Sequence, residues 1–158
     1  MKKSGLLFNL LCSALVILLP LALYTETGKL EYSFSAYYNT SAFYILTCGL
    51  LLVAFSFLVS ENITSGLLLI GVALFDTYEY TIVHNLFASL FFLHTTYHII
   101  NDKRYGILGV PIIISAFFIP YITLFWFEVI AVICLGIHGV LYSLKKLKLI
   151  EKRRRLKQ

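Results

Sequence analysis

The chain has 158 residues, of which 59% are hydrophobic and only 13% are charged. A soluble domain carries about 25% charged residues, so this composition excludes an ordinary soluble domain as well as a disordered chain. Eight of the thirteen Lys and Arg residues lie in the last fourteen positions, and a basic run after an apolar segment favours a membrane protein over a nucleic-acid-binding one. We therefore predict an all-α integral membrane protein with one polytopic domain over residues 1–144 and no nucleic-acid partner.

Three apolar runs come first, and each is compared with the roughly 20 helical residues that cross a hydrocarbon core. Residues 5–24 form the first run. Its end lacks the small residues of a signal-peptide cleavage site, so we expect an uncleaved span. Residues 41–59 form the second run. Residues 63–75 form the third, which is short for a span.

Three further spans are expected in the second half of the chain. Residues 82–100 form the fourth, and a polar segment follows it. Residues 107–144 are almost continuously apolar, and one helix of that length would measure about 60 Å, twice the hydrocarbon core. Because Pro120 ends the helix before it, we expect a fifth span over residues 107–119 and a sixth over residues 123–144.

Six spans place the basic residues on one side of the membrane. With the N-terminus inside, twelve Lys and Arg residues fall on the inner side and only Lys29 on the outer side. This asymmetry follows the positive-inside rule, so we expect both termini in the cytoplasm, in a bacterial inner membrane. The basic tail over residues 145–158 is expected to contact anionic lipids of the inner leaflet, in addition to the surrounding bilayer. A membrane-protein partner or a homo-oligomer stays open.

The segment "YSFSAYYNTS" at residues 32–41 stands out in a mostly apolar chain, with three tyrosines and three serines just before a long apolar run. Tyrosines at this depth are typical of an interfacial aromatic belt, and a site open to the outside is the alternative. A carboxylate beside His84 would make it a candidate acid, base or proton relay. The candidate outer polar site consists of Tyr37, Tyr38, Asn39, Thr40, Asp76, Glu79, His84 and Glu128.

Histidines form a stripe on the fourth expected helix. At 100° per residue His84, His94 and His98 fall within about 80° of one another, so the stripe is expected to face the bundle interior. His94 and His98 have a spacing that chelates zinc. His94 and His138 have matched depths on two helices, as bis-histidine haem ligation requires. Zinc and haem are thus alternatives to the main expectation of no cofactor, in which the histidines make interhelical hydrogen bonds.

Three segments come in a distinctive order: "SFSAYYNT" at 33–40, "ENITSGLLLIGVALFDT" at 61–77 and "VHNLFASLFFL" at 83–93. Together they resemble a family of small bacterial six-span membrane proteins of unknown function. That family carries an SxSxYYxT segment, an acid–asparagine pair, a GVALFP segment and a histidine that opens the next helix. Asp76 stands where the family has proline, and Ala42 and Phe43 replace an arginine–aspartate pair, so an activity carried by that pair would be absent.

A more distant resemblance concerns the alkaline ceramidase-like membrane hydrolases. "AYYNTSAF" is similar to a segment of that family, which uses an aspartate and an HxxxH pair around zinc. The resemblance implies Asn39, Thr40, Asp76, His94 and His98 as counterparts. This chain has Tyr37 and Tyr38 where that family has an acid and an aromatic, it has fewer spans, and its HxxxH follows Asp76 too closely.

We therefore expect an integral membrane protein without enzymatic activity, with an outward-facing polar site for a small molecule, a lipid headgroup or a partner protein. A zinc-dependent hydrolase acting on lipids is the alternative, and a bis-histidine haem protein is the second alternative.

Overall fold

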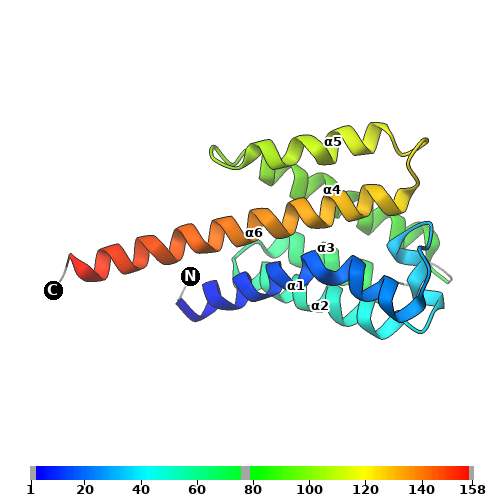
Figure 1. Cartoon of the computed structure of the whole chain (residues 1–158), viewed down its shortest axis with the longest axis horizontal. Helices are drawn as coiled ribbons and strands as arrows, with labels where there is room; N and C mark the ends of the chain where they lie inside the picture. Colours follow the sequence, from blue (N-terminus) through cyan, green and yellow to red (C-terminus); the bar gives the residue numbers. More distant parts are fainter. Residues whose placement is uncertain (1–2, 76–78, 157–158) are drawn as a thin grey trace.

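A computed structural model describes residues 3–75 and 79–156 of the chain, and in these residues every regular element is a helix (Figure 1). The predicted all-α class is therefore confirmed. The elements are α1 (Lys3–Thr27), the 3₁₀-helix η1 (Phe34–Asn39), α2 (Phe43–Val59), α3 (Ile63–Leu74), α4 (Thr81–Ile100), the 3₁₀-helix η2 (Gly106–Leu108), α5 (Gly109–Phe117) and α6 (Leu124–Arg155).

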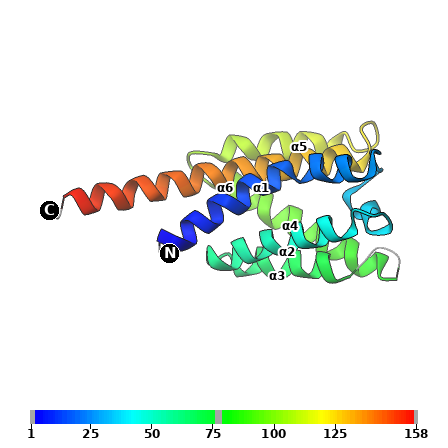
Figure 2. The ribbon, with the colours of Figure 1, turned by 60° about the horizontal axis from the view of Figure 1, so that its bottom comes forward.

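The α-helices lie along one axis and alternate in direction (Figures 1 and 2). Each packs against the next in the chain, and α1 packs against α6, so the helices form a closed ring. One end of the ring, here called the terminal end, carries the start of α1, the connection between α2 and α3, and the connection between α4 and η2. The opposite end, here called the η1 end, carries η1 and the start of α6.

Two helices among the described residues are long and apolar enough to cross a membrane: α1 and the part of α6 over Leu124–Arg153. α3 has 12 residues and α5 has 9, which correspond to about 18 and 14 Å of helical rise. α5 is short because η2 precedes it and a turn that contains Pro120 follows it. Helix length thus identifies two candidate spans rather than the six that the apolar runs predict.

α6 is longer than the span expected over residues 123–144. It continues without a break to Arg155, and its end projects beyond the other helices (Figures 1 and 2). Lys, Leu, Arg and Glu in the basic tail are all good helix formers, and no proline or glycine follows Gly139. The tail is therefore a helical extension of α6.

Glycines occupy the places where neighbouring helices come closest. A Cβ atom at Gly139 in α6 would overlap the Oγ of Ser13 in α1. A Cβ atom at Gly71 in α3 would overlap the ring of Phe87 in α4. Contact through small residues is the usual way in which helices associate when water supplies no hydrophobic force between them.

A polar contact joins three helices close to the contact between Gly139 and Ser13. Asn9 in α1 donates from Nδ2 to the Oγ of Ser143 in α6 at 2.8 Å, and Ser56 in α2 donates to Oδ1 of Asn9. All three side chains are buried, so loss of one partner would leave the others unsatisfied. The contact therefore fixes α1 against both of its neighbours.

We predict that Gly139→Ala destabilises the protein by about 1–3 kcal/mol, because the added methyl group overfills the contact between α1 and α6. Adding Ser13→Ala removes the overlapping Oγ and should recover part of the loss. Thermal unfolding of the purified protein in detergent measures both effects. Equal stability of Gly139→Ala and the unmodified protein would contradict the close packing described here.

Candidate functional site

A cavity of about 670 Å³ opens at the terminal end of the ring. Five helices line it: α1, α2, α3, α4 and α6. Its inner part is apolar and includes Leu19, Leu50, Leu69, Phe91 and Leu135. The two parts of its wall differ in polarity, because the residues at its mouth are polar: Glu61, Asn62, His98, Asn101, Asp102, His138 and Tyr142.

The apolar floor and the polar mouth are separated along the helices. Leu50 on α2 and Ser60 at the C-cap of α2 both line the cavity, and ten residues of helical rise correspond to about 15 Å. Val132 and Tyr142 on α6 are separated in the same way. The cavity therefore has the amphipathic lining of a site for a small molecule with a polar head and an apolar body.

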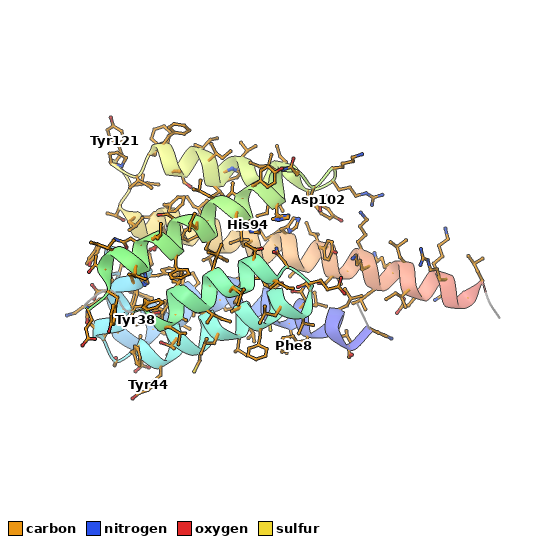
Figure 3. All side chains as sticks on the ribbon, turned by 180° about the vertical axis from the view of Figure 1, so that it is seen from behind. Phe8, Tyr38, Tyr44, His94, Asp102 and Tyr121 are labelled. Atoms are coloured by element: carbon orange, nitrogen blue, oxygen red, sulfur yellow. The ribbon has the colours of Figure 1, made fainter. Side chains whose placement is uncertain are left out.

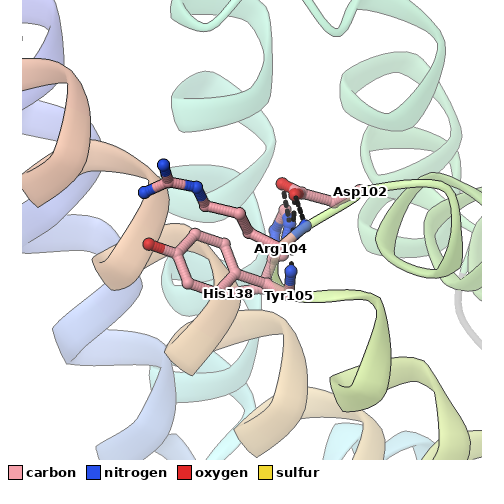
Figure 4. A network of polar contacts seen from close by, with 4 residues as sticks. All are labelled: Asp102, Arg104, Tyr105 and His138. Atoms are coloured by element: carbon pink, nitrogen blue, oxygen red, sulfur yellow. Dashed lines mark hydrogen bonds and ion pairs between the residues drawn. The ribbon is translucent and has the colours of Figure 1, made fainter.

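Asp102 and His138 form a network of polar contacts at the mouth (Figure 4). Nε2 of His138 lies 3.2 Å from Oδ2 of Asp102, and Oδ1 of Asp102 accepts from the backbone N–H of Arg104 at 2.9 Å. Partial burial raises the pKa of Asp102, but the backbone N–H of Arg104 and the imidazole of His138 outweigh it and hold the pKa below its usual value. Asp102 is therefore a carboxylate at neutral pH.

His94 and His98 line the same cavity, and His94 lies towards the end that holds Asp102 (Figure 3). Nδ1 of His94 is 3.0 Å from the Oγ of Ser65, and the rings of His94 and His98 are 4.6 Å apart between centroids. The expected interior orientation thus agrees with the structure for the half-buried His94, whereas His98 is exposed. In the described part of the chain, no three His, Cys, Asp or Glu side chains are placed to hold a metal. His94 and His98 therefore supply two of the three protein ligands that a catalytic zinc site uses.

The tyrosine-rich segment lies at the η1 end of the ring, away from this cavity. Tyr37 is fully buried and donates from its hydroxyl to the carbonyl oxygen of Lys29 at 2.9 Å. Tyr38 donates to the carbonyl oxygen of Val72 in α3 at 3.0 Å. Thr40 donates to the carbonyl oxygen of Tyr37 at 2.8 Å, and Asn39 is exposed at the end of η1.

His84 packs against this segment and is 1% exposed. Its Nε2 lies 2.8 Å from the Oγ of Ser35 in η1, and its Nδ1 lies 2.6 Å from the carbonyl oxygen of Phe75. The ring of Tyr38 meets it edge-on at 5.9 Å. The structure therefore brings Tyr38 and His84 together, as the outer-site hypothesis requires.

The remaining members of the predicted outer site are spread around the same end. Oε2 of Glu128 in α6 accepts from the backbone N–H of Phe34 in η1 at 2.6 Å, and Glu128 is buried. Glu79 is exposed just before α4, and Asp76 lies outside the described residues. Because Tyr37, Tyr38, His84 and Glu128 bond to other protein groups, they join η1 to α3, α4 and α6. Ligand binding by this cluster stays a prediction.

Sequence reasoning missed the residues of the cavity that lie on α1 and α2. Asn9 and Ser13 are four residues apart within an apolar run, and Ser56 and Ser60 have the same spacing. Residues at this spacing share one helix face. This pattern was the available signal that each helix turns a polar strip towards the ring interior.

Residues 59–143, which are more than half of the chain, match the model of a family of unknown function, DUF7103. The chain therefore belongs to this family. The match agrees with the expectation of an uncharacterised family, although it begins after the tyrosine-rich segment. It includes Asp102 and the cavity residues of α3, α4 and α6. No curated protein and no solved structure matches the chain.

The backbone at the cavity mouth is strained at Glu61, which has φ of 68°. Helix α2 ends there in a Schellman motif: Asn62 N–H donates to the carbonyl oxygen of Phe57 at 2.9 Å, and Glu61 N–H donates to that of Leu58 at 3.1 Å. Glycine normally occupies this left-handed position, and a side chain costs roughly 1 kcal/mol there. Such strain is commonly found at functional sites.

We predict that Glu61→Gly is more stable than Glu61→Ala by about 1 kcal/mol, because glycine adopts the positive φ without a Cβ clash. Both variants lack the carboxylate, so their difference isolates the backbone strain. Their melting temperatures in detergent test the prediction. A Glu61→Ala variant as stable as Glu61→Gly would show that Glu61 does not sit in the left-handed conformation.

Proposed function

We propose that the protein is a six-span integral membrane protein that binds a small amphipathic molecule in the cavity at its cytoplasmic end. The observation that carries the proposal is the cavity itself, with its apolar floor and polar mouth. In this proposal the protein binds its ligand without changing it. The bound molecule would lie with its head group at the level of Asp102 and its apolar part between the helices.

Exposed apolar side chains support the membrane location. On α1 the exposed residues Leu7, Leu11, Leu15 and Leu18 recur every three or four positions and form one stripe. A similar stripe on α4 consists of Ile82, Leu86, Leu90, Leu93 and Tyr97. Continuous apolar stripes facing outward suit contact with lipid, whereas soluble monomers rarely expose apolar patches of this size.

The helix directions support the proposed topology. Because the helices alternate, Lys3, Lys103, Arg104 and the tail lie at the terminal end, and Lys29 follows α1 at the η1 end. This distribution agrees with a cytoplasmic terminal end under the positive-inside rule. The short helices α3 and α5 pack against longer neighbours, and non-helical backbone at membrane depth is tolerated where protein covers it.

In this proposal the cluster of Tyr37, Tyr38, His84 and Glu128 closes the ring at the η1 end. Its buried polar atoms are occupied by protein partners, whereas the mouth at the terminal end is lined by exposed polar groups such as His98 and Asn101. The site for a small molecule is therefore assigned to the cytoplasmic side rather than to the outward-facing side that the sequence favours.

Zinc hydrolysis and haem binding are alternative functions of the same cavity, since His94, His98 and His138 all line it. A hydrolase would need a third ligand beside His94 and His98. Metal analysis and a visible spectrum of the purified protein separate these alternatives from the proposal. Stoichiometric zinc would favour the hydrolase, and a Soret band would favour the haem protein.

We predict that cysteine at position 29 is labelled from outside the cell and cysteine at position 103 only from the cytoplasm. A membrane-impermeant maleimide on intact and permeabilised cells tests this, with Lys29→Cys and Lys103→Cys in a Cys48→Ala background. Labelling of Lys103→Cys in intact cells would exclude the proposed orientation.

We also predict that Leu135→Trp weakens ligand binding at least about tenfold, because the larger side chain fills the apolar part of the cavity. Leu86→Trp, on the exposed face of α4, is the matched control and should bind normally. Mass spectrometry of molecules that co-purify with each variant, and titration of a fluorescent amphiphile in nanodiscs, measure the effect. Unchanged binding by Leu135→Trp would remove the cavity as the site.

A further inference from the structure

We propose that the protein carries its ligand across the membrane, with the segment η1 as the gate on the outer side. This proposal rests on the proposed function, because the molecule that is carried is the amphiphile held in the same cavity. The depth of the cavity, the polar groups beyond its floor and the way in which η1 is attached carry the argument.

The cavity reaches from the terminal end to about the middle of the helix ring. On α6 its lining runs from Tyr142 to Val132, and ten residues of helical rise correspond to about 15 Å. From Val132 to Leu124, where α6 begins, the remaining rise is about 12 Å. The cavity therefore crosses about half of a hydrocarbon core of about 30 Å, and carriers hold their substrates near the middle of the bilayer.

A cluster of buried side chains closes the cavity at its floor. This cluster, here called the plug, consists of Leu23, Tyr37, Phe125 and Val129, and it packs against Leu19 and Val132 of the cavity wall. The plug is assembled from three separate elements, α1, η1 and α6. Because Tyr37 belongs to η1, a displacement of η1 would remove part of the plug.

Two buried polar groups lie beyond the cavity floor, on the side of the η1 end. Glu128 lies one helical turn from Val132 and is 7% exposed. Thr47 lies three residues from the wall residue Leu50, and its Oγ1 is buried without a hydrogen-bond partner among the described residues. Ionisable groups inside a membrane are costly and commonly mark the pathway of a substrate. These two groups therefore suit a pathway that continues beyond the floor.

η1 is a short segment with extended backbone at both ends. Its caps Ser33 and Thr40 have φ of −156° and −123°, with ψ of 164° and 174°. Domain and loop movements are commonly absorbed by a few residues at the ends of such elements. The two caps are therefore placed to act as hinges for η1.

Side-chain hydrogen bonds attach η1 to the neighbouring helices. Phe34 N–H donates to Oε2 of Glu128 in α6 at 2.6 Å, and the Oγ of Ser35 lies 2.8 Å from Nε2 of His84 in α4. The hydroxyl of Tyr38 donates to a carbonyl oxygen of α3. These contacts stabilise the closed arrangement, and their loss would release η1 without breaking any of the α-helices.

The first test measures access to the plug from outside the cell. Val129→Cys, in a chain that also carries Cys12→Ala, Cys48→Ala and Cys134→Ala, is treated with a membrane-impermeant methanethiosulfonate on intact cells. An opening gate exposes position 129, so we expect labelling at least about tenfold faster than at Ala54→Cys, a position buried between α2 and α3. Equally slow labelling at both positions would overturn the proposal.

Two variants of the hydrogen bonds locate the gate. Glu128→Ala removes the acceptor of Phe34 N–H, and His84→Ala removes the partner of Ser35 while leaving the carboxylate beside position 129 in place. Each should accelerate outside labelling of Val129→Cys at least about fivefold, because the closed state loses a contact. Glu26→Ala is the matched control, since Glu26 is an exposed carboxylate near the end of α1. Rates that stay unchanged in the variants that fold would overturn η1 as the gate.

The second test measures movement of an amphiphile. A fluorescent NBD-labelled lysophosphatidylcholine is distributed over both leaflets of proteoliposomes, and dithionite added outside bleaches the outer leaflet. A carrier brings the inner pool to the outside, so we expect bleaching of that pool at least about tenfold faster than with Leu135→Trp protein.

The outcomes distinguish transport from the proposed function. Binding of the probe that Leu135→Trp abolishes, together with an inner pool that stays unbleached, overturns transport but keeps the cavity as a site. Probe binding that Leu135→Trp leaves unchanged counts against the proposed function itself, and the labelling of Val129→Cys then decides about the gate.

Discussion

Close approach of helices at glycines determines how this ring is built. With no side chain at Gly139, α6 lies against Ser13 of α1, and the first and last helices of the chain meet. That contact places Asn9 within hydrogen-bonding distance of Ser143, and Ser56 then joins the same group. The cavity depends on this arrangement, because α1 and α6 supply two of its walls. The close packing of α1 and α6 therefore underlies both the Asn9 contact and two walls of the cavity.

The polar side chains at the two ends of the ring have different surroundings. At the η1 end, His84 bonds to Ser35 and Phe75, and Glu128 bonds to Phe34, so polar groups removed from water have protein partners. Satisfied groups of this kind rigidify a structure. At the terminal end polar side chains such as His98 and Asn101 line the mouth of a cavity. This difference is the physical basis for placing the proposed ligand at the terminal end.

Sequence reasoning predicted the helical class and the approximate helix positions, because apolar runs and Pro120 are local signals. It did not predict the full length of α6, since lysine-rich segments are helix formers as well as topology signals. The histidine stripe was correctly expected to face inward for His94. Sequence reasoning placed its candidate site at the other end of the ring, because "YSFSAYYNTS" is conspicuous as one segment. The cavity is assembled from single polar residues such as Asn9 and Asp102 on separate elements, and only tertiary packing brings these together.

The uninterrupted length of α6 has a mechanical consequence. One rigid helix carries Glu128 at the η1 end, His138 at the cavity and the basic extension that projects past the ring. A surface that bound the extension, such as an anionic lipid surface, would act on α6 at a distance from the ring. A tilt of α6 would displace His138 relative to Asp102 on the loop after α4. The width of the cavity mouth would then depend on what the C-terminal extension of α6 binds.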